Sequence, residues 1–116
     1  MSQSLLRGAN QSLIELLQDC VQACNECATD CLREPDLRML TRCIQLDRDC
    51  ADICVLTSQY FSRQSEFASA LAGQCVIICD ACAQECEKHS DMAHCKECAE
   101  ICRKCASECR KAAKGM

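Results

Sequence analysis

The stretch CVQACNECATDC, residues 20–31, carries four cysteines at intervals of four, three and four residues. Residues three and four apart lie on one face of an α-helix, so these cysteines form a single stripe. Stripes with this spacing are normally built from leucine, and they mark the face that a helix buries in a bundle. The stretch therefore predicts a helix that buries a row of thiols.

The same spacing recurs along the whole chain, which has sixteen cysteines among its 116 residues. Residues 75–86, CVIICDACAQEC, repeat the intervals of four, three and four. Within each segment, neighbouring cysteines are three, four or seven residues apart. The complete set is Cys20, Cys24, Cys27, Cys31, Cys43, Cys50, Cys54, Cys75, Cys79, Cys82, Cys86, Cys95, Cys98, Cys102, Cys105 and Cys109. So many cysteines at helical spacing are not expected to serve only as small core residues. For Cys20 and Cys109, which should lie farthest from the hairpin loops, a purely structural role is the alternative.

The two halves of the chain are related by an offset of 55 residues, which places all seven cysteines of the first half on cysteines of the second. The two cysteines left over, Cys95 and Cys102, align with Leu40 and Asp47. Each half is predicted to form a helical hairpin, and two hairpins make a four-helix bundle. We expect an all-α fold, an antiparallel up-down-up-down four-helix bundle built from two duplicated helical hairpins, as one domain over residues 1–116.

Turn and capping residues divide the chain into four expected helices. Capping residues included, they span about residues 4–33, 35–62, 65–88 and 90–113. Pro35 is expected in the first turn of the second helix, Ser65 as the cap of the third, and Ser90 or Asp91 as the cap of the fourth. The short breaks make the two helices of each hairpin antiparallel, so both hairpin loops should lie at one end of the bundle.

This layout predicts two different halves of the core. The cysteines should form a tube that opens toward the hairpin loops; Cys95 to Cys109 alone would span roughly 21 Å along a helix. Ordinary hydrophobic residues should close the far end. These are Leu13, Ile14, Leu17, Leu56, Phe61, Phe67 and Leu71.

Composition argues against several functions and compartments. A net charge of −4 without a basic stripe argues against nucleic-acid binding. No apolar run approaches the roughly 20 residues that a membrane span needs. The first ten residues show no apolar signal region, so we expect a cytoplasmic protein whose thiols stay reduced.

Clustered thiolates are soft ligands that select Cu(I), Zn(II) or iron–sulfur clusters. Charge balance favours Cu(I), because one monovalent ion per thiolate leaves the core near neutral, whereas four-cysteine zinc sites would bury a large negative charge. Neutrality alone predicts a capacity of about sixteen Cu(I) ions. Iron–sulfur triplets such as Cys20, Cys24 and Cys27 are a by-product of helical spacing in a chain this short.

Two other functions remain alternatives. One is a general sink for zinc and other thiophilic metals, of the metallothionein type. The other is a redox module that cycles through disulfides, which would require distortion because side chains at i and i+4 diverge. The sequence offers no convincing pair of nucleophile and base, so we expect a binding protein and not an enzyme.

The four-three-four ladders, the cysteines in all four expected helices and the absent export signal resemble the cytosolic copper storage proteins, and the resemblance covers essentially the whole chain. It implies a four-helix bundle that stores or buffers many Cu(I) ions through its core cysteines. It also implies a homotetramer, and a copper chaperone is a candidate partner. The chain departs from an all-cysteine pattern at Asp47, where its duplicate has Cys102.

Four residues near the hairpin loops are candidates for the place where copper enters. They are Met39, His89, Met92 and His94. We favour Met39, expected in the seam, and His89; for Met92 and His94 simple tolerance near a loop is an equal alternative. In the resembled family, histidine and methionine at the open end have such a role. Asp47 is expected to lean toward solvent, with hydrogen bonding to thiols or metal ligation as alternatives.

Overall fold

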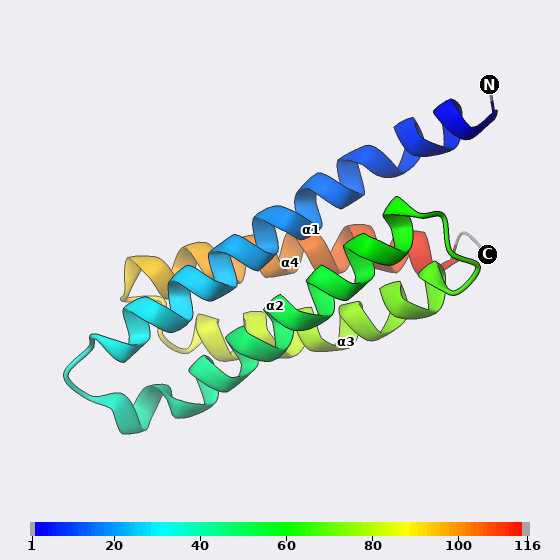
Figure 1. Ribbon diagram of the computed structural model, residues 1–116. Coiled ribbons are helices and arrows are strands. Elements are labelled where there is room, and N and C mark those ends of the chain that lie inside the picture. The colour runs from blue at the N-terminus through cyan, green and yellow to red at the C-terminus, as the bar shows by residue number, and fades with distance from the viewer. Residues whose placement is uncertain (1, 115–116) are drawn as a thin grey trace.

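The computed structural model describes residues 2–114, which form four α-helices and one short 3-10 helix (Figure 1). Met1 and residues 115–116, the ends of the expected domain, lie outside the described residues. Within the described range there is no strand. The elements are α1 (Ser2–Leu32), η1 (Leu37–Leu40), α2 (Thr41–Ser62), α3 (Ala68–Glu87) and α4 (Ala93–Lys114).

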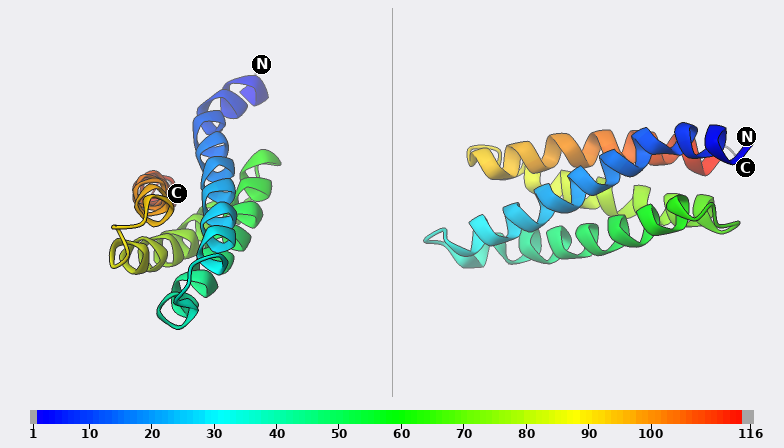
Figure 2. Two further views of the ribbon diagram at one scale, coloured as in Figure 1. Left: turned by 90° about the vertical axis from the view of Figure 1, so that its left-hand side faces the viewer. Right: turned by 45° about the horizontal axis from the view of Figure 1, so that its top comes forward.

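The helices form one elongated bundle, with principal extents of 53 × 19 × 18 Å. Each helix packs against its neighbours in the chain, and α1 also packs against α4. The α1–α2 and α3–α4 loops lie at one end, whereas both termini and the α2–α3 connection lie at the other (Figures 1 and 2). This arrangement confirms the predicted antiparallel four-helix bundle.

The first hairpin loop is longer than predicted. The expected second helix began at Pro35, but α2 begins at Thr41. After α1, the backbone N–H of Glu34 donates to the carbonyl of Cys31, and Pro35 lies in the bend that follows. Proline disfavours a helical conformation in the residue before it, so α1 ends near this point. The intervening η1 turns the chain and buries Leu40.

The other two predicted caps are only partly right. The Ser65 hydroxyl accepts a hydrogen bond from the backbone N–H of Phe67 at 3.1 Å, so Ser65 does cap the turn ahead of α3. The prediction for α4 was wrong, because this helix begins at Ala93 and its first turn uses the carbonyl of Met92, which accepts from the N–H of Lys96.

The core changes character along the bundle axis, as predicted. Leu17 is completely buried at the end away from the hairpin loops, and Ile14 and Phe61 are nearly so. Two expected members of this plug are wrong: Leu56 is 40% exposed and Phe67 is 60% exposed. Leu13 and Leu71 are half-buried.

Helical phase explains the error at Leu56. The buried face of α2 continues from Cys54 to Thr57, Ser58 and Phe61, which leaves Leu56 on the outer surface. The hydroxyls of Thr57 and Ser58 donate to the backbone carbonyls of Ile53 and Val55, and these bonds make burial of the two polar side chains tolerable.

Candidate metal centre

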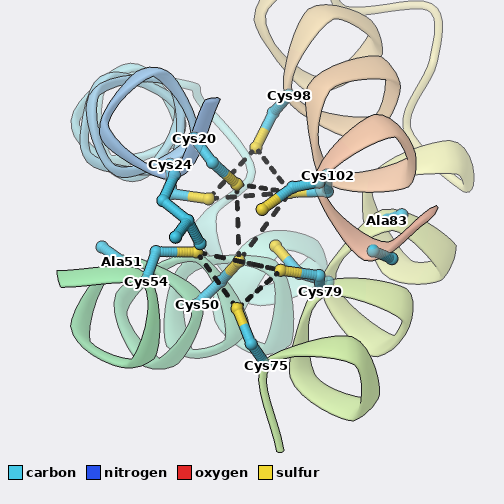
Figure 3. Packing of buried hydrophobic residues seen from close by; sticks show 14 of the residues in the cluster. Cys20, Cys24, Cys50, Ala51, Cys54, Cys75, Cys79, Ala83, Cys98 and Cys102 are labelled. Carbon is cyan, nitrogen blue, oxygen red and sulfur yellow. Dashed lines mark hydrogen bonds between the residues drawn. The ribbon is translucent and has the colours of Figure 1, made fainter. Parts of the chain in front are cut away.

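All sixteen cysteine side chains are buried, with exposed fractions of 0–1%, and all are free thiols. Figure 3 shows cysteines from all four helices converging on the bundle interior. The labelled cysteines are Cys20 and Cys24 of α1, Cys50 and Cys54 of α2, Cys75 and Cys79 of α3, and Cys98 and Cys102 of α4. The prediction that the ladders face a shared interior is confirmed.

The sulfur atoms lie in contact across the helix interfaces. The Sγ–Sγ distance is 3.5 Å between Cys50 and Cys79, and 3.6 Å between Cys24 and Cys102. A soft metal lies about 2.3 Å from a thiolate sulfur, so two sulfurs on one ion are roughly 4 Å apart. The thiols therefore already have nearly the spacing that a shared ion requires.

The thiols form overlapping groups of four, within which the sulfur atoms all lie within 4.8 Å of one another. Five groups are Cys27, Cys31, Cys43 and Cys95; Cys24, Cys82, Cys98 and Cys102; Cys20, Cys24, Cys50 and Cys102; Cys20, Cys50, Cys54 and Cys79; and Cys54, Cys75, Cys79 and Cys105. Because four of these groups share members, they make a continuous chain of sulfur along the bundle axis. Cys20 belongs to two of the groups, which argues against a merely structural role.

Burial opposes ionisation of these thiols in the absence of metal. At the loop end, loss of hydration and, to a smaller extent, the nearby thiol of Cys43 raise the pKa of Cys31 to about 12. A second thiolate beside the first would be costlier still, because like charges repel strongly in a medium of low polarity. The metal-free core is therefore a set of neutral thiols, and each loses its proton only when a cation replaces it.

Asp47 is the one carboxyl group among the thiols, and the expectation that it leans toward solvent was wrong. Its side chain is completely buried. Its Oδ1 accepts hydrogen bonds from Cys82 at 3.2 Å and Cys98 at 3.4 Å, and Cys86 is 3.6 Å away. The position continues the buried stripe between Cys43 and Cys50, so it has no route to solvent.

Loss of hydration, with a further contribution from Cys98, Cys82 and Cys43, raises the pKa of Asp47 to about 11. The carboxyl group is therefore protonated and neutral at physiological pH. This removes the cost of a lone buried charge.

At the loop end, the prediction that Met39 lies in the buried seam was wrong. Met39, expected in the buried seam, is 61% exposed, whereas the adjacent Leu40 is completely buried among the thiols. The 3-10 geometry of η1 shifts the phase by which residues face the core, and a continuous helix from Pro35 would not have done so. Met92 is partly buried and packs against the core.

The two histidines have different surroundings. His89 is buried, and its Nε2 pairs with Oε2 of Glu85 at 3.2 Å, so this contact faces a carboxylate and not a thiol. Glu85 also pairs with Arg42 and Lys88, at 3.5 and 3.3 Å. This cluster ties α2 to the end of α3, and the sequence alone did not reveal it.

His94 is the histidine that contacts the thiols. Its Nδ1 lies 3.5 Å from the sulfur of Cys95, 3.7 Å from Cys27 and 3.9 Å from Cys31. Its Nε2 lies 3.3 Å from Oε2 of Glu34 on the other side of the ring. A carboxylate that accepts the Nε2 proton leaves the Nδ1 lone pair directed at the sulfurs, which is the usual support for a metal-binding histidine.

Fold and site together define a class of protein: a helical bundle that encloses a long core of free thiols suited to soft metal ions. Comparison with known proteins agrees. Residues 7–114 match the family model described as Csp, copper storage protein, and the chain belongs to this family. No helix within residues 2–114 is long and apolar enough to cross a membrane.

Three relatives illustrate the similarity. An uncharacterized cysteine-rich protein, YhjQ of Bacillus subtilis (strain 168), is 44% identical over 91 residues, covering 78% of this chain and 83% of that protein. The Cu(I)-bound copper storage protein BsCsp3 of Bacillus subtilis is 44% identical with a TM-score of 0.85, covering 90% of this chain and 97% of that one. A cytosolic copper storage protein from Streptomyces lividans, described as loaded with five coppers, is 39% identical with a TM-score of 0.90, covering 97% and 98%.

Proposed function

We propose that this protein stores Cu(I) in its core, with all sixteen cysteines as ligands. The observation that carries the proposal is the continuous chain of buried, free thiols in overlapping groups of four. Each arriving ion replaces one thiol proton and lets its sulfur bridge to a neighbouring ion. A full load of about sixteen monovalent ions leaves the core neutral, which the low polarity of this interior demands.

Zinc is the weaker cargo for the same core. A divalent ion held by four thiolates retains a net charge of −2, and a row of such sites would place like charges a few ångströms apart. The copper-bound relatives support the monovalent ion as well. We also propose that the activity is binding and not catalysis.

Copper is proposed to reach the thiols through His94. Its Nδ1 faces Cys27, Cys31 and Cys95, so an ion held there can pass to sulfur with a movement of a few ångströms. Met92, packed beside the core, and the exposed Met39 are proposed to assist at the same end, as is His89. A copper chaperone is the proposed donor.

The remaining expectations concern the whole chain. We propose that residues 1–116 act as one cytoplasmic storage domain, in line with the relative described as cytosolic. We propose a homotetramer as well. Hydrophobic side chains on the outer faces of α2 and α3 support self-association: Val55, Leu56 and Ile77 are 40–63% exposed.

The test is an anaerobic titration of the reduced protein with Cu(I) in the presence of a chromophoric Cu(I) chelator. We expect about sixteen ions to bind before the chelator responds, while the helical circular dichroism changes little because the bundle is already formed. A plateau near four ions, or helix formation that begins only with metal, would contradict the proposal. Retention of Zn(II) in the presence of equimolar Cu(I) would favour the general metal sink.

A further inference from the structure

Packed side chains close the axial end of the thiol core next to the hairpin loops. Leu40, the last residue of η1, is completely buried in the same cluster as the cysteines. Met92, just ahead of α4, packs against this cluster, and His89 is buried and held by Glu85. An ion that approached along the bundle axis would therefore have to displace packed side chains before it met sulfur.

The flank between α1 and α4 is different, because a crevice of about 110 Å³ there reaches the thiols. Two of the residues that line it are Cys27 on α1 and Cys98 on α4. These are the two cysteines with an exposed fraction of 1%, while the other fourteen have 0%. Its complete lining is Ala23, Glu26, Cys27, Asp30, His94, Glu97 and Cys98.

The rim of this crevice suits a cation. Glu26 and Glu97 are exposed on opposite walls, and Asp30 is half-buried beside them. Asp30 pairs at 3.7 Å with Arg33, which follows the end of α1 and is largely exposed. Carboxylates gathered in a concave site concentrate cations there and speed their arrival, most strongly at low ionic strength.

The floor of the crevice connects to the thiol chain in both directions. Cys27 lies 3.9 Å from Cys31 and Cys95, which belong to the group nearest the loops. Cys98 lies 3.8 Å from Cys24 and 3.9 Å from Cys102, which lead deeper into the bundle. An ion that enters at this point can therefore fill either part of the store.

We propose that the crevice between α1 and α4 is a lateral gate for Cu(I), in which Glu26, Asp30 and Glu97 collect the cation, His94 in its lining holds it, and Cys27 and Cys98 receive it. The proposal rests on the proposed storage function and specifies its route. At the floor, a copper–sulfur bond forms as the thiol S–H bond breaks, and the proton leaves to water in the crevice. No electron is transferred.

The first test removes the charges and keeps the shape. The triple variant Glu26→Gln, Asp30→Asn, Glu97→Gln is loaded anaerobically with Cu(I) supplied as its acetonitrile complex, and the rate is followed by the ultraviolet absorbance of the copper–thiolate bonds. We expect loading to slow on the order of 10-fold at low ionic strength, and the difference to shrink in roughly 0.5 M salt. The matched control is Asp19→Asn, Asp49→Asn, Asp52→Asn, which loses the same charge from exposed positions outside the crevice. Equal rates for the two triple variants would overturn the gate.

The second test blocks the passage. Ala23→Leu adds three carbon atoms to the crevice wall, and Ala81→Leu makes the same change at a half-buried position of α3 outside it. We expect Ala23→Leu to load more slowly than Ala81→Leu while both reach the same final copper count. Unchanged loading in Ala23→Leu, with its circular dichroism intact, would place the route elsewhere. Failure of the storage function itself is distinguishable, because the unmodified protein would then retain few ions at any rate of loading.

Discussion

Replacing Asp47 with asparagine should stabilise the metal-free protein at neutral pH and remove most of the pH dependence that this residue causes. The folded-state pKa of Asp47 is about 11, and an aspartate in an unfolded chain has a pKa of about 3.9. Between these values the folded state binds one more proton than the unfolded state. The free energy of unfolding therefore falls as pH rises, by about 1.4 kcal/mol per pH unit.

The expected magnitudes follow from this slope. From pH 5.5 to pH 7.5, Asp47 should cost the natural protein about 2.7 kcal/mol of stability, and by pH 7.5 the total cost is about 5 kcal/mol. The asparagine carbonyl can still accept from Cys82 and Cys98, but its amide protons have poor acceptors among sulfurs, at a cost of about 1–3 kcal/mol. The variant should then be about 2–4 kcal/mol more stable at pH 7.5 and nearly equal at pH 5.5.

The assay is urea denaturation of both proteins, reduced and metal-free, at pH 5.5, 6.5 and 7.5. The groups that face the carboxyl are Cys43 of α2, Cys82 and Cys86 of α3, and Cys98 of α4, and they are present in both proteins. Their contribution cancels in the difference. A control, Asp49→Asn, removes an exposed charge two residues after Asp47, on the outer face of α2, and should leave the slope unchanged. If Asp47→Asn and the natural protein show parallel pH dependences, the assignment of a buried neutral acid is wrong.

Three further changes test other parts of the structure. Leu17→Ala should lower the free energy of unfolding by about 2–5 kcal/mol in urea denaturation without changing the copper count, because this fully buried residue offers no metal ligand. Gln64→Gly should raise thermal stability by about 0.5–1 kcal/mol, since Gln64 has a φ of 53° just after α2; a lower melting temperature would argue against strain there. The double variant His89→Ala, Met39→Ala should slow copper loading in stopped-flow without lowering capacity, and His94→Ala should slow it more because His94 contacts three thiols; a lower final count would make these residues storage ligands.

Local periodicity was enough to predict most of the fold. Intervals of three and four residues require each cysteine stripe to lie on one helix face, and every cysteine is buried as a result. The short connection near residue 90 similarly required an antiparallel hairpin. Both inferences depend on local backbone geometry, which can be predicted from the spacing of residues in the sequence.

The errors occur where the helical phase changes along the chain, or where contacts with another helix determine which side chains are buried and which residues meet. The 3-10 turn at Leu37–Leu40 buries Leu40 and exposes Met39, and nothing in the spacing before Cys43 distinguishes the two. Leu56 was expected in the core from its spacing, although Thr57 and Ser58 occupy the buried face. Glu34 could not be linked to His94 in advance, because the two are far apart in the chain and meet only across the α1–α4 interface.

The amino-acid sequence alone specified a bundle with a thiol interior, because helical pitch converts residue spacing into direction. The packing of the helices determined the protonation state and the contacts of the polar groups in that interior. It enclosed Asp47 among thiols and thereby kept its proton, and it directed one histidine toward sulfur and the other toward Glu85. It also left Cys27 and Cys98 at the floor of a crevice between two helices. Loss of hydration and contacts between distant helices depend on how all four helices come together, and no single segment of the chain contains that information.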